Sequence, residues 1–168
     1  KTGCLSDCVI IKHGRKHRYL SEGDVPVYGS GGIIRYVDQS LYDQESILIP
    51  RKGSLNHVFY VNEPFWPGDT MFYSQSKQPY MAKYLYHYLK CQDLYAMNSG
   101  SIIPSLTAAA LNNLSVIIPP EEKRLQFDSV VSPIYLLIKK TENEINAIRK
   151  IKHSLFQKYF VEEIPYDT

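Results

Sequence analysis

The 168-residue chain has 44% hydrophobic and 21% charged residues and a net charge of only +2, which is typical of a globular protein with one core-forming domain and a small appendage. The low net charge excludes a protein that is basic throughout, and no apolar stretch approaches the ~20 residues needed to span a bilayer. No signal-peptide pattern opens the chain, and Cys4, Cys8 and Cys91 are too few for a disulfide framework, so we expect a cytoplasmic, reduced protein without a membrane partner.

The first part of the chain, from residue 5 to about residue 75, has the pattern of short β-strands. Five runs rich in β-branched and aromatic residues have Gly, Pro, Asn or Asp near their ends. These runs are residues 8–12, 24–29, 33–38, 46–50 and 57–61. Their spacing of roughly ten residues predicts a curled sheet or a barrel-like β subdomain.

The period changes in the sequence MAKYLYHYLKCQ, residues 81–92, which predicts a helix. One face of this helix is apolar and aromatic, and we interpret it as a core face. Its residues are Tyr84, Leu85, Tyr88 and Leu89. Residues 99–120 then predict a glycine loop, an extended piece, a short helix capped near Ser105 or Thr107, and a strand that ends at two prolines.

A long amphipathic helix is predicted for residues 134–160, with Ser132-Pro133 as its start because proline suits a first helical position. Its length would be about 40 Å. Apolar or small residues recur at steps of three and four at Ile134, Ile138, Thr141, Ile145, Ile148, Ile151, Leu155 and Tyr159. The sequence contains no second long helix, so we expect this face to pack against another molecule.

Positive charge and glycine gather at two places in the strand-rich part. Residues 12–18, KHGRKHR, contain four Lys or Arg and two His without an acid, a run that attracts phosphates or forms a solvated basic loop. Residues 29–32, GSGG, do not match the dinucleotide fingerprint, since the third glycine is misplaced and no helix follows. Close backbone approach to a phosphate and simple turn geometry both stay open for these glycines.

These loops have the residue types that bind DNA. Backbone N–H groups of glycines and serine hydroxyls contact phosphates, while Lys and Arg supply charge and contact base edges. The candidate DNA-binding residues are Lys12, Arg15, Lys16, Arg18, Gly29, Ser30, Gly31, Gly32, Arg35, Arg51, Lys52, Ser99 and Ser101, with Gly100 beside the last two.

Other chemistry is not indicated. Cys4, Cys8, His13 and His17 form the pattern C-x3-C-x4-H-x3-H, but a zinc finger needs about twelve residues between its second cysteine and first histidine. Cys8 also lies in a predicted strand, where a buried free cysteine is common. No P-loop, G-x-S-x-G, H-E-x-x-H or kinase signature is present, so we expect neither a metal site nor catalytic residues.

Ordered sequence blocks cover nearly the whole chain: CLSDCV, then GDVPVYGSGGIIRYVD, SILIPRKGSLNHVFYV and PFWPGDTMFY, then SIIPSLTAAALNNLSVIIPPEEKR and INAIRKIKHSLFQKYF. They resemble, in order, the opening block, recognition-domain core, closing block and conserved spacer helix of the DNA-specificity (S) subunits of type I restriction-modification systems. Two details depart from that family. Ser6 stands where a glycine is usual, and Glu121-Glu122-Lys123 follow the double proline where Glu-Gln is common.

The resemblance implies an α+β fold. A curled, mostly β target recognition domain with a few short helices is expected at residues 1–122, followed by a long C-terminal amphipathic, coiled-coil helix in a spacer and dimerisation region at residues 123–168. It implies sequence-specific recognition of double-stranded DNA without catalysis or a cofactor in this chain. S-adenosylmethionine, ATP and Mg are expected only on the partner subunits, a modification (methyltransferase) subunit and a restriction (translocase and nuclease) subunit.

A usual S subunit has two recognition domains and two spacer helices, whereas this sequence shows one of each. We expect either a cut half of such a subunit or a naturally half-sized one that forms a homodimer. The predicted dimerisation residues are Ile134, Ile138, Ile145, Ile148 and Leu155.

Two other functions stay open. The chain could be the recognition region of a stand-alone restriction enzyme or DNA methyltransferase, although the Asn-Pro-Pro-aromatic motif and a cofactor glycine loop are absent. A truncated protein-interaction subunit is the second.

Overall fold

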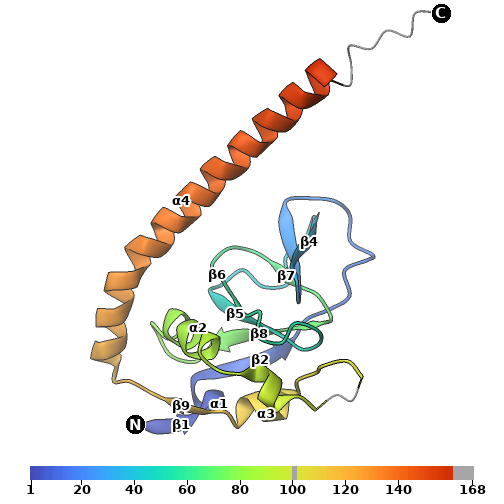
Figure 1. Cartoon of the computed structure of the whole chain (residues 1–168). Helices are drawn as coiled ribbons and strands as arrows, with labels where there is room; N and C mark the ends of the chain where they lie inside the picture. Colours follow the sequence, from blue (N-terminus) through green and yellow to red (C-terminus); the bar gives the residue numbers. More distant parts are fainter. Residues whose placement is uncertain (100–101, 161–168) are drawn as a thin grey trace, which may run out of the picture. The chain divides into compact units, whose positions relative to one another are not determined.

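A computed structural model describes residues 1–99 and 102–160, and the chain divides into two compact units, Lys1–Gln126 and Phe127–Thr168 (Figure 1). The strands are β1 (Thr2–Cys4), β2 (Val9–His13), β3 (Val25–Gly29), β4 (Gly32–Val37), β5 (Ser46–Pro50), β6 (Phe59–Val61), β7 (Trp66–Pro67), β8 (Met71–Ser76) and β9 (Ser115–Ile117). The helices are α1 (Leu5–Cys8), α2 (Ala82–Lys90), the 3-10 helix η1 (Leu94–Met97), α3 (Ala108–Asn112) and α4 (Glu121–Phe160). The predicted α+β fold class is confirmed.

The strands form three small sheets rather than one closed barrel. β2, β8, β5 and β6 make a four-stranded antiparallel sheet, and β1 pairs with β9. The third sheet has the order β4-β3-β7, in which β3 and β4 form an antiparallel hairpin and β7 lies parallel to β3. The predicted strand at residues 46–50 coincides with β5, whereas β2 begins at Val9 because the four residues before it form α1.

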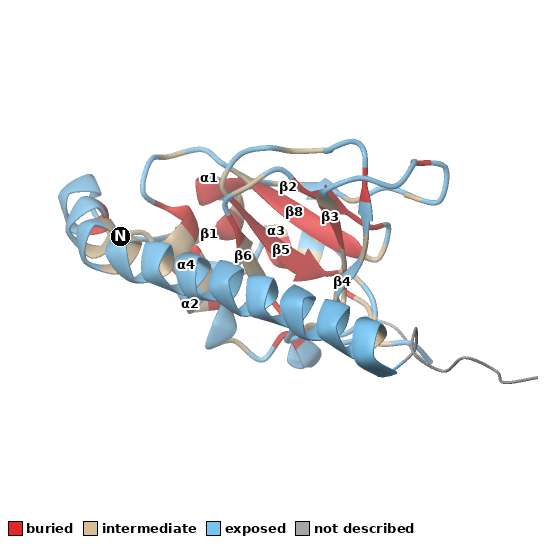
Figure 2. Ribbon diagram, turned by 90° about the horizontal axis from the view of Figure 1, so that it is seen from above, coloured by how far each residue is buried: buried red, intermediate tan, exposed pale blue. Residues whose placement is uncertain are grey.

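Strand β5 is buried along its whole length because both faces of its sheet are covered (Figure 2). Successive side chains of a strand point to opposite faces. Ile47 and Ile49 accordingly pack in a core with residues of the short helices, such as Leu85, while Leu48 packs in a second core with the aromatic residue Phe65. The four-stranded sheet is therefore the centre of the first unit.

Helix α2 covers part of this sheet with the predicted face. Leu85 and Leu89 are fully buried, and Tyr84 and Tyr88 are half-buried beside them. The Tyr84 hydroxyl donates to the carbonyl of Ile117 at 2.8 Å, which satisfies the polar end of a largely packed ring. The interpretation of this face as core is confirmed.

The start of α3 agrees with one of the two predicted caps. The Thr107 hydroxyl oxygen accepts a hydrogen bond from the backbone N–H of Ala110 at 3.1 Å, which satisfies one of the free amides at the helix start. Thr107 is thus the N-cap residue.

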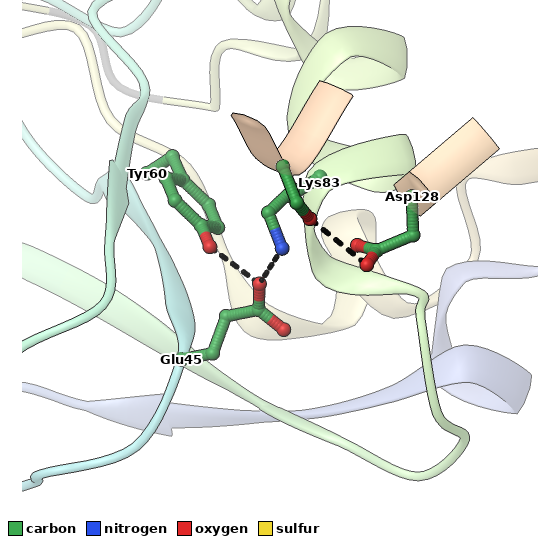
Figure 3. Close-up of polar contacts among 5 residues, drawn as sticks. Glu45, Tyr60, Lys83 and Asp128 are labelled. Carbon is green, nitrogen blue, oxygen red and sulfur yellow. Dashed lines mark hydrogen bonds and ion pairs between the residues drawn. The ribbon is translucent and has the colours of Figure 1, made fainter. Parts of the chain in front are cut away.

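A small polar cluster connects α2 to the sheet (Figure 3). Glu45 accepts hydrogen bonds from the Lys83 ammonium at 2.9 Å and from the Tyr60 hydroxyl. The Lys83 Nζ also lies 5.5 Å from the centre of the Tyr60 ring. These partly buried contacts hold the residue directly before β5 against α2 and β6.

The prediction that the long helix begins at Ser132-Pro133 is wrong: α4 begins at Glu121 and runs through Pro133. Glu121 and Glu122 follow a double proline and place negative charge in the first turn, where the helix dipole favours it. The Ser132 hydroxyl does not cap a helix but donates to Asp128 one turn earlier at 2.9 Å. An α-helix of 40 residues is about 60 Å long.

Within the described residues, no helix combines the length and the apolar character needed to cross a membrane.

Candidate nucleic-acid interface

The basic run leaves β2 and forms a loop that main-chain contacts hold against β7. The backbone N–H of Arg15 donates to the carbonyl of Pro67 at 2.9 Å, and the Trp66 indole N–H donates to the carbonyl of Arg15 at 3.1 Å. Gly14 permits this approach, because a Cβ there would lie 2.0 Å from the carbonyl oxygen of Gly68. The main chain is therefore anchored while four cationic side chains stay exposed, those of Lys12, Arg15, Lys16 and Arg18.

A recess of about 390 Å³ lies between this loop and the turn from β7 to β8. It is lined by Lys16, His17, Arg18 and Asp69. Its lining includes two cationic residues and one carboxylate, and the buried Nδ1 of His17 has no hydrogen-bond partner within the described residues. The recess has the size and the charge to take a phosphate group.

The glycine-rich sequence forms the β3–β4 hairpin, with Ser30 and Gly31 at its turn. Gly32 has φ +123°, a conformation that L side chains rarely adopt. A Cβ at Gly29 would lie 2.6 Å from the Ile34 side chain, whereas a Cβ at Gly31 would meet nothing within 4 Å. Gly29 and Gly32 therefore have local structural roles, and Gly31 is the open point of the turn.

Arg35 does not extend freely from this hairpin. Its side chain is half-buried, and Nη2 donates to the carbonyl of Leu20 at 3.1 Å. This hydrogen bond connects β4 to the end of the basic loop, so the Arg35 side chain has a structural contact that the side chains of Arg15 and Lys16 do not have within the described residues.

Two loops from distant parts of the sequence meet beside the hairpin turn. The backbone N–H of Gly53 donates to the carbonyl of Pro104 at 3.0 Å, and Lys52 forms an isolated β-bridge with Ser105. Ser99 donates from its backbone N–H to the carbonyl of Ser105 at 2.9 Å. The main chain of Arg51 also lies in this region, accepting from the N–H of Leu106.

The hairpin turn itself contacts the first of these loops. His57 Nδ1 lies 3.1 Å from the carbonyl oxygen of Ser30. A Cβ atom added at Gly53 would lie 2.9 Å from the Ser30 hydroxyl oxygen, so the two loops are in close contact here. The structure therefore brings three loops together, and we call Ser30, Lys52, Gly53, His57 and Ser105 the three-loop junction.

Gly53→Ala should destabilise the first unit by about 1–2 kcal/mol, because Gly53 has φ +89° and an added methyl group would crowd Ser30. The single tryptophan, Trp66, is 4% exposed and reports unfolding by its fluorescence. Gly31→Ala, whose methyl group meets open space, is the matched control. Equal unfolding midpoints for the two variants in denaturant would show that the junction does not constrain Gly53.

The structure thus places three of the predicted positions, Ser30, Lys52 and Ser99, in or beside one junction. The Arg35 side chain binds the end of the basic loop, and Arg15 anchors that loop to Pro67. Gly100 and Ser101 lie outside the described residues. His57 and Gly53 were not among the residues predicted from the sequence. Gly53 could have been predicted as a turn residue, because a glycine directly after Arg51-Lys52 indicates a tight loop. No local pattern indicated His57, since its contact residue Ser30 is 27 positions away.

The five predicted dimerisation residues, Ile134, Ile138, Ile145, Ile148 and Leu155, all lie on α4 and are exposed. Ile148 is the most exposed of them at 65% and Ile145 the least at 42%. A row of large apolar side chains in water is unfavourable, and such a face usually marks an interaction site.

The cysteine and histidine pattern does not assemble. Cys8 is fully buried in the core, and burial raises the pKa of its thiol, which disfavours the thiolate that metal ligation requires. In the part of the chain that the structure describes, no three His, Cys, Asp or Glu residues gather so that they could hold a metal ion.

Residues 1–150 match the family model described as "Type I restriction modification DNA specificity domain". Two named proteins are similar in sequence. A protein of Haemophilus influenzae named as a type I restriction enzyme specificity subunit is 28% identical over 118 residues, which cover 66% of this chain and 31% of that protein. A protein of Mycoplasma pneumoniae named as a type I specificity subunit is 27% identical over 152 residues, covering 84% of this chain and 48% of that protein.

The crystal structure of the S subunit of a type I restriction-modification system from M. genitalium has the same fold. The TM-score is 0.72 at 14% sequence identity, and the match covers 97% of this chain and 46% of that one. The chain therefore spans less than half the length of each of these three proteins.

Proposed function

Because the chain belongs to the type I restriction modification DNA specificity domain family, we propose that it recognises one half of a bipartite double-stranded DNA target. The observation that carries this proposal is a shared anchor. The basic loop is bound to Pro67 through Arg15, and β3 of the glycine hairpin is bound to the next residue, Gly68, whose N–H donates to the carbonyl of Tyr28 at 2.8 Å. The cations of the basic loop and the open turn at Gly31 are thus both held by the segment Pro67-Gly68. Such a fixed arrangement allows phosphates and base edges to be contacted at the same time.

In this proposal the chain itself is not catalytic. Residues 1–122 form the recognition domain, and residues 123–168 form the spacer that helps to assemble a modification subunit and a restriction subunit in a cytoplasmic complex. S-adenosylmethionine, ATP and Mg act on those subunits. The DNA-contacting residues proposed are the exposed cations of the basic loop, Ser30 and Gly31 of the turn, and Lys52 of the junction.

Two copies of the chain pair through the exposed row on α4. If the two helices pack antiparallel, the dimer has two-fold symmetry and presents two identical recognition domains. Its target is then a palindrome of two half-sites separated by a nonspecific gap, since half-site spacing follows from the geometry of the dimer. Two observations support the pairing of two chains: the five apolar residues of α4 are exposed, and each chain has a single recognition domain.

Binding of duplex DNA by the chain should be weak and should weaken steeply with salt. Each phosphate contact contributes about −0.9 to the slope of log affinity against log salt concentration, so the five cations Lys12, Arg15, Lys16, Arg18 and Lys52 would give a slope of about −4.5. Fluorescence anisotropy of a labelled duplex across a salt series measures this slope. A flat response would show that these side chains do not contact DNA.

A further inference from the structure

His57 is the junction residue with the best defined side-chain geometry. Its backbone N–H donates to the carbonyl of Ser54 at 3.0 Å, which fixes the loop around it. Its ring packs against Phe59 with 4.4 Å between ring centres, and Nδ1 lies 3.1 Å from the Ser30 carbonyl oxygen. The ring is therefore held on two sides, although the residue as a whole is exposed.

These contacts decide which ring nitrogen carries the hydrogen. A carbonyl oxygen only accepts hydrogen bonds, so Nδ1 must be the donor in the contact with Ser30. In the neutral imidazole the other nitrogen, Nε2, then has a lone pair and is an acceptor. Within residues 1–99 and 102–160, Nε2 makes no hydrogen bond.

A hydrogen-bond acceptor on an exposed residue complements the cationic side chains of the loops. Lys52, in the same loop, and the cations of the basic loop only donate, so they suit phosphates and the acceptor atoms of guanine. In the major groove, the donors are the exocyclic amino groups of adenine and cytosine. A fixed acceptor therefore distinguishes these two bases from guanine and thymine on the same strand.

We propose that His57 is a specificity-determining residue whose Nε2 accepts a hydrogen bond from the amino group of an adenine or a cytosine in the major groove. This inference rests on the proposed function. It assigns to His57 a base contact, and to the Ser30 carbonyl the role of fixing the tautomer, as the second hydrogen bond of a histidine ring does elsewhere.

Two substitutions separate base recognition from the structural contact. His57→Asn retains a donor near the position of Nδ1 and can keep the bond to Ser30, but it has no group at the position of Nε2. His57→Gln retains an amide oxygen near Nε2 and loses the donor to Ser30. Each variant and the wild-type chain would be used to select duplexes from a random pool at pH 8, with folding checked by Trp66 fluorescence.

The wild-type chain should enrich adenine or cytosine at one position of the half-site. His57→Asn should enrich the same site with discrimination at that position reduced about 5- to 150-fold, and discrimination at all other positions unchanged. His57→Gln should retain part of the discrimination. A duplex that carries a base analogue without the amino group at that position should weaken binding by the wild-type chain and not by His57→Asn.

Three results would overturn the proposal. Unchanged discrimination by a folded His57→Asn would show that Nε2 contacts no base, while the proposed function would stand. A uniform loss of affinity for all sequences would make His57 a phosphate-contacting or purely structural residue. If the wild-type chain enriched no sequence at all, the proposed function would fail together with the role of His57.

Discussion

The wild-type chain is expected to sediment as a dimer at micromolar concentration, and the double substitution of Ile145→Asp and Ile148→Asp should produce a monomer. Both side chains are exposed on α4, at 42% and 65%, and lie three residues apart in the apolar row. Burying four carboxylates in a dimer interface without partners would cost several kcal/mol for each ion, and the burial of four isoleucine side chains would be lost as well. Sedimentation equilibrium measures the change.

A matched control has the same added charge outside the row. Asn143 and Asn146 are exposed residues of the same helix that lie outside the apolar row. The chain with both Asn143→Asp and Asn146→Asp should therefore remain a dimer. Both variants should retain the buried environment of Trp66, because this residue belongs to the first unit. A wild-type chain that is monomeric at high micromolar concentration would contradict the dimer and leave the chain as one half of a larger subunit.

The second large effect is expected on DNA affinity. Replacing Arg15, Lys16, Arg35 and Lys52 by alanine should lower affinity about 10²- to 10³-fold near physiological salt and reduce the magnitude of the salt slope by about 2.7, because Arg15, Lys16 and Lys52 are the proposed phosphate contacts among the four. Binding by the quadruple variant and the wild-type chain is compared by anisotropy over the same salt series. Intact affinity and specificity in the quadruple variant would show that this placement of the interface is wrong.

The single substitutions divide the four residues. Lys16→Ala and Lys52→Ala should weaken binding to all sequences alike, as expected for exposed phosphate contacts. Arg35→Ala should instead lower the unfolding midpoint, since it removes the hydrogen bond to the carbonyl of Leu20. A control with Lys140, Lys150 and Lys152 of α4 replaced by alanine removes three charges elsewhere and should leave the salt slope close to that of the wild-type chain.

Local patterns in the sequence were sufficient where local forces decide the structure. A run of five apolar or small residues predicted β5, and the spacing of Leu85 and Leu89 predicted the buried face of α2. The start of α4 was predicted wrongly because a proline inside a helix and a proline at its first position look alike in sequence. The earlier double proline and the two glutamates after it were the stronger signal.

For the candidate site, the sequence predicted which types of residue take part but not how they are arranged in space. Charge and glycine content identified Arg15, Lys52 and the hairpin turn, but their anchoring depends on contacts between distant segments. The Trp66 indole binds the carbonyl of Arg15 across 51 positions, and His57 contacts Ser30 across 27. No periodicity or local motif specifies such pairs, so the three-loop junction and the proposed role of His57 could be derived only from the structure.

Selection of duplexes from a random pool by the wild-type chain, with the modification subunit present, tests sequence-specific half-site recognition most directly. The account predicts an enriched target of two inverted copies of one short half-site at a fixed nonspecific spacing. A pool in which no motif is enriched over the input would contradict it.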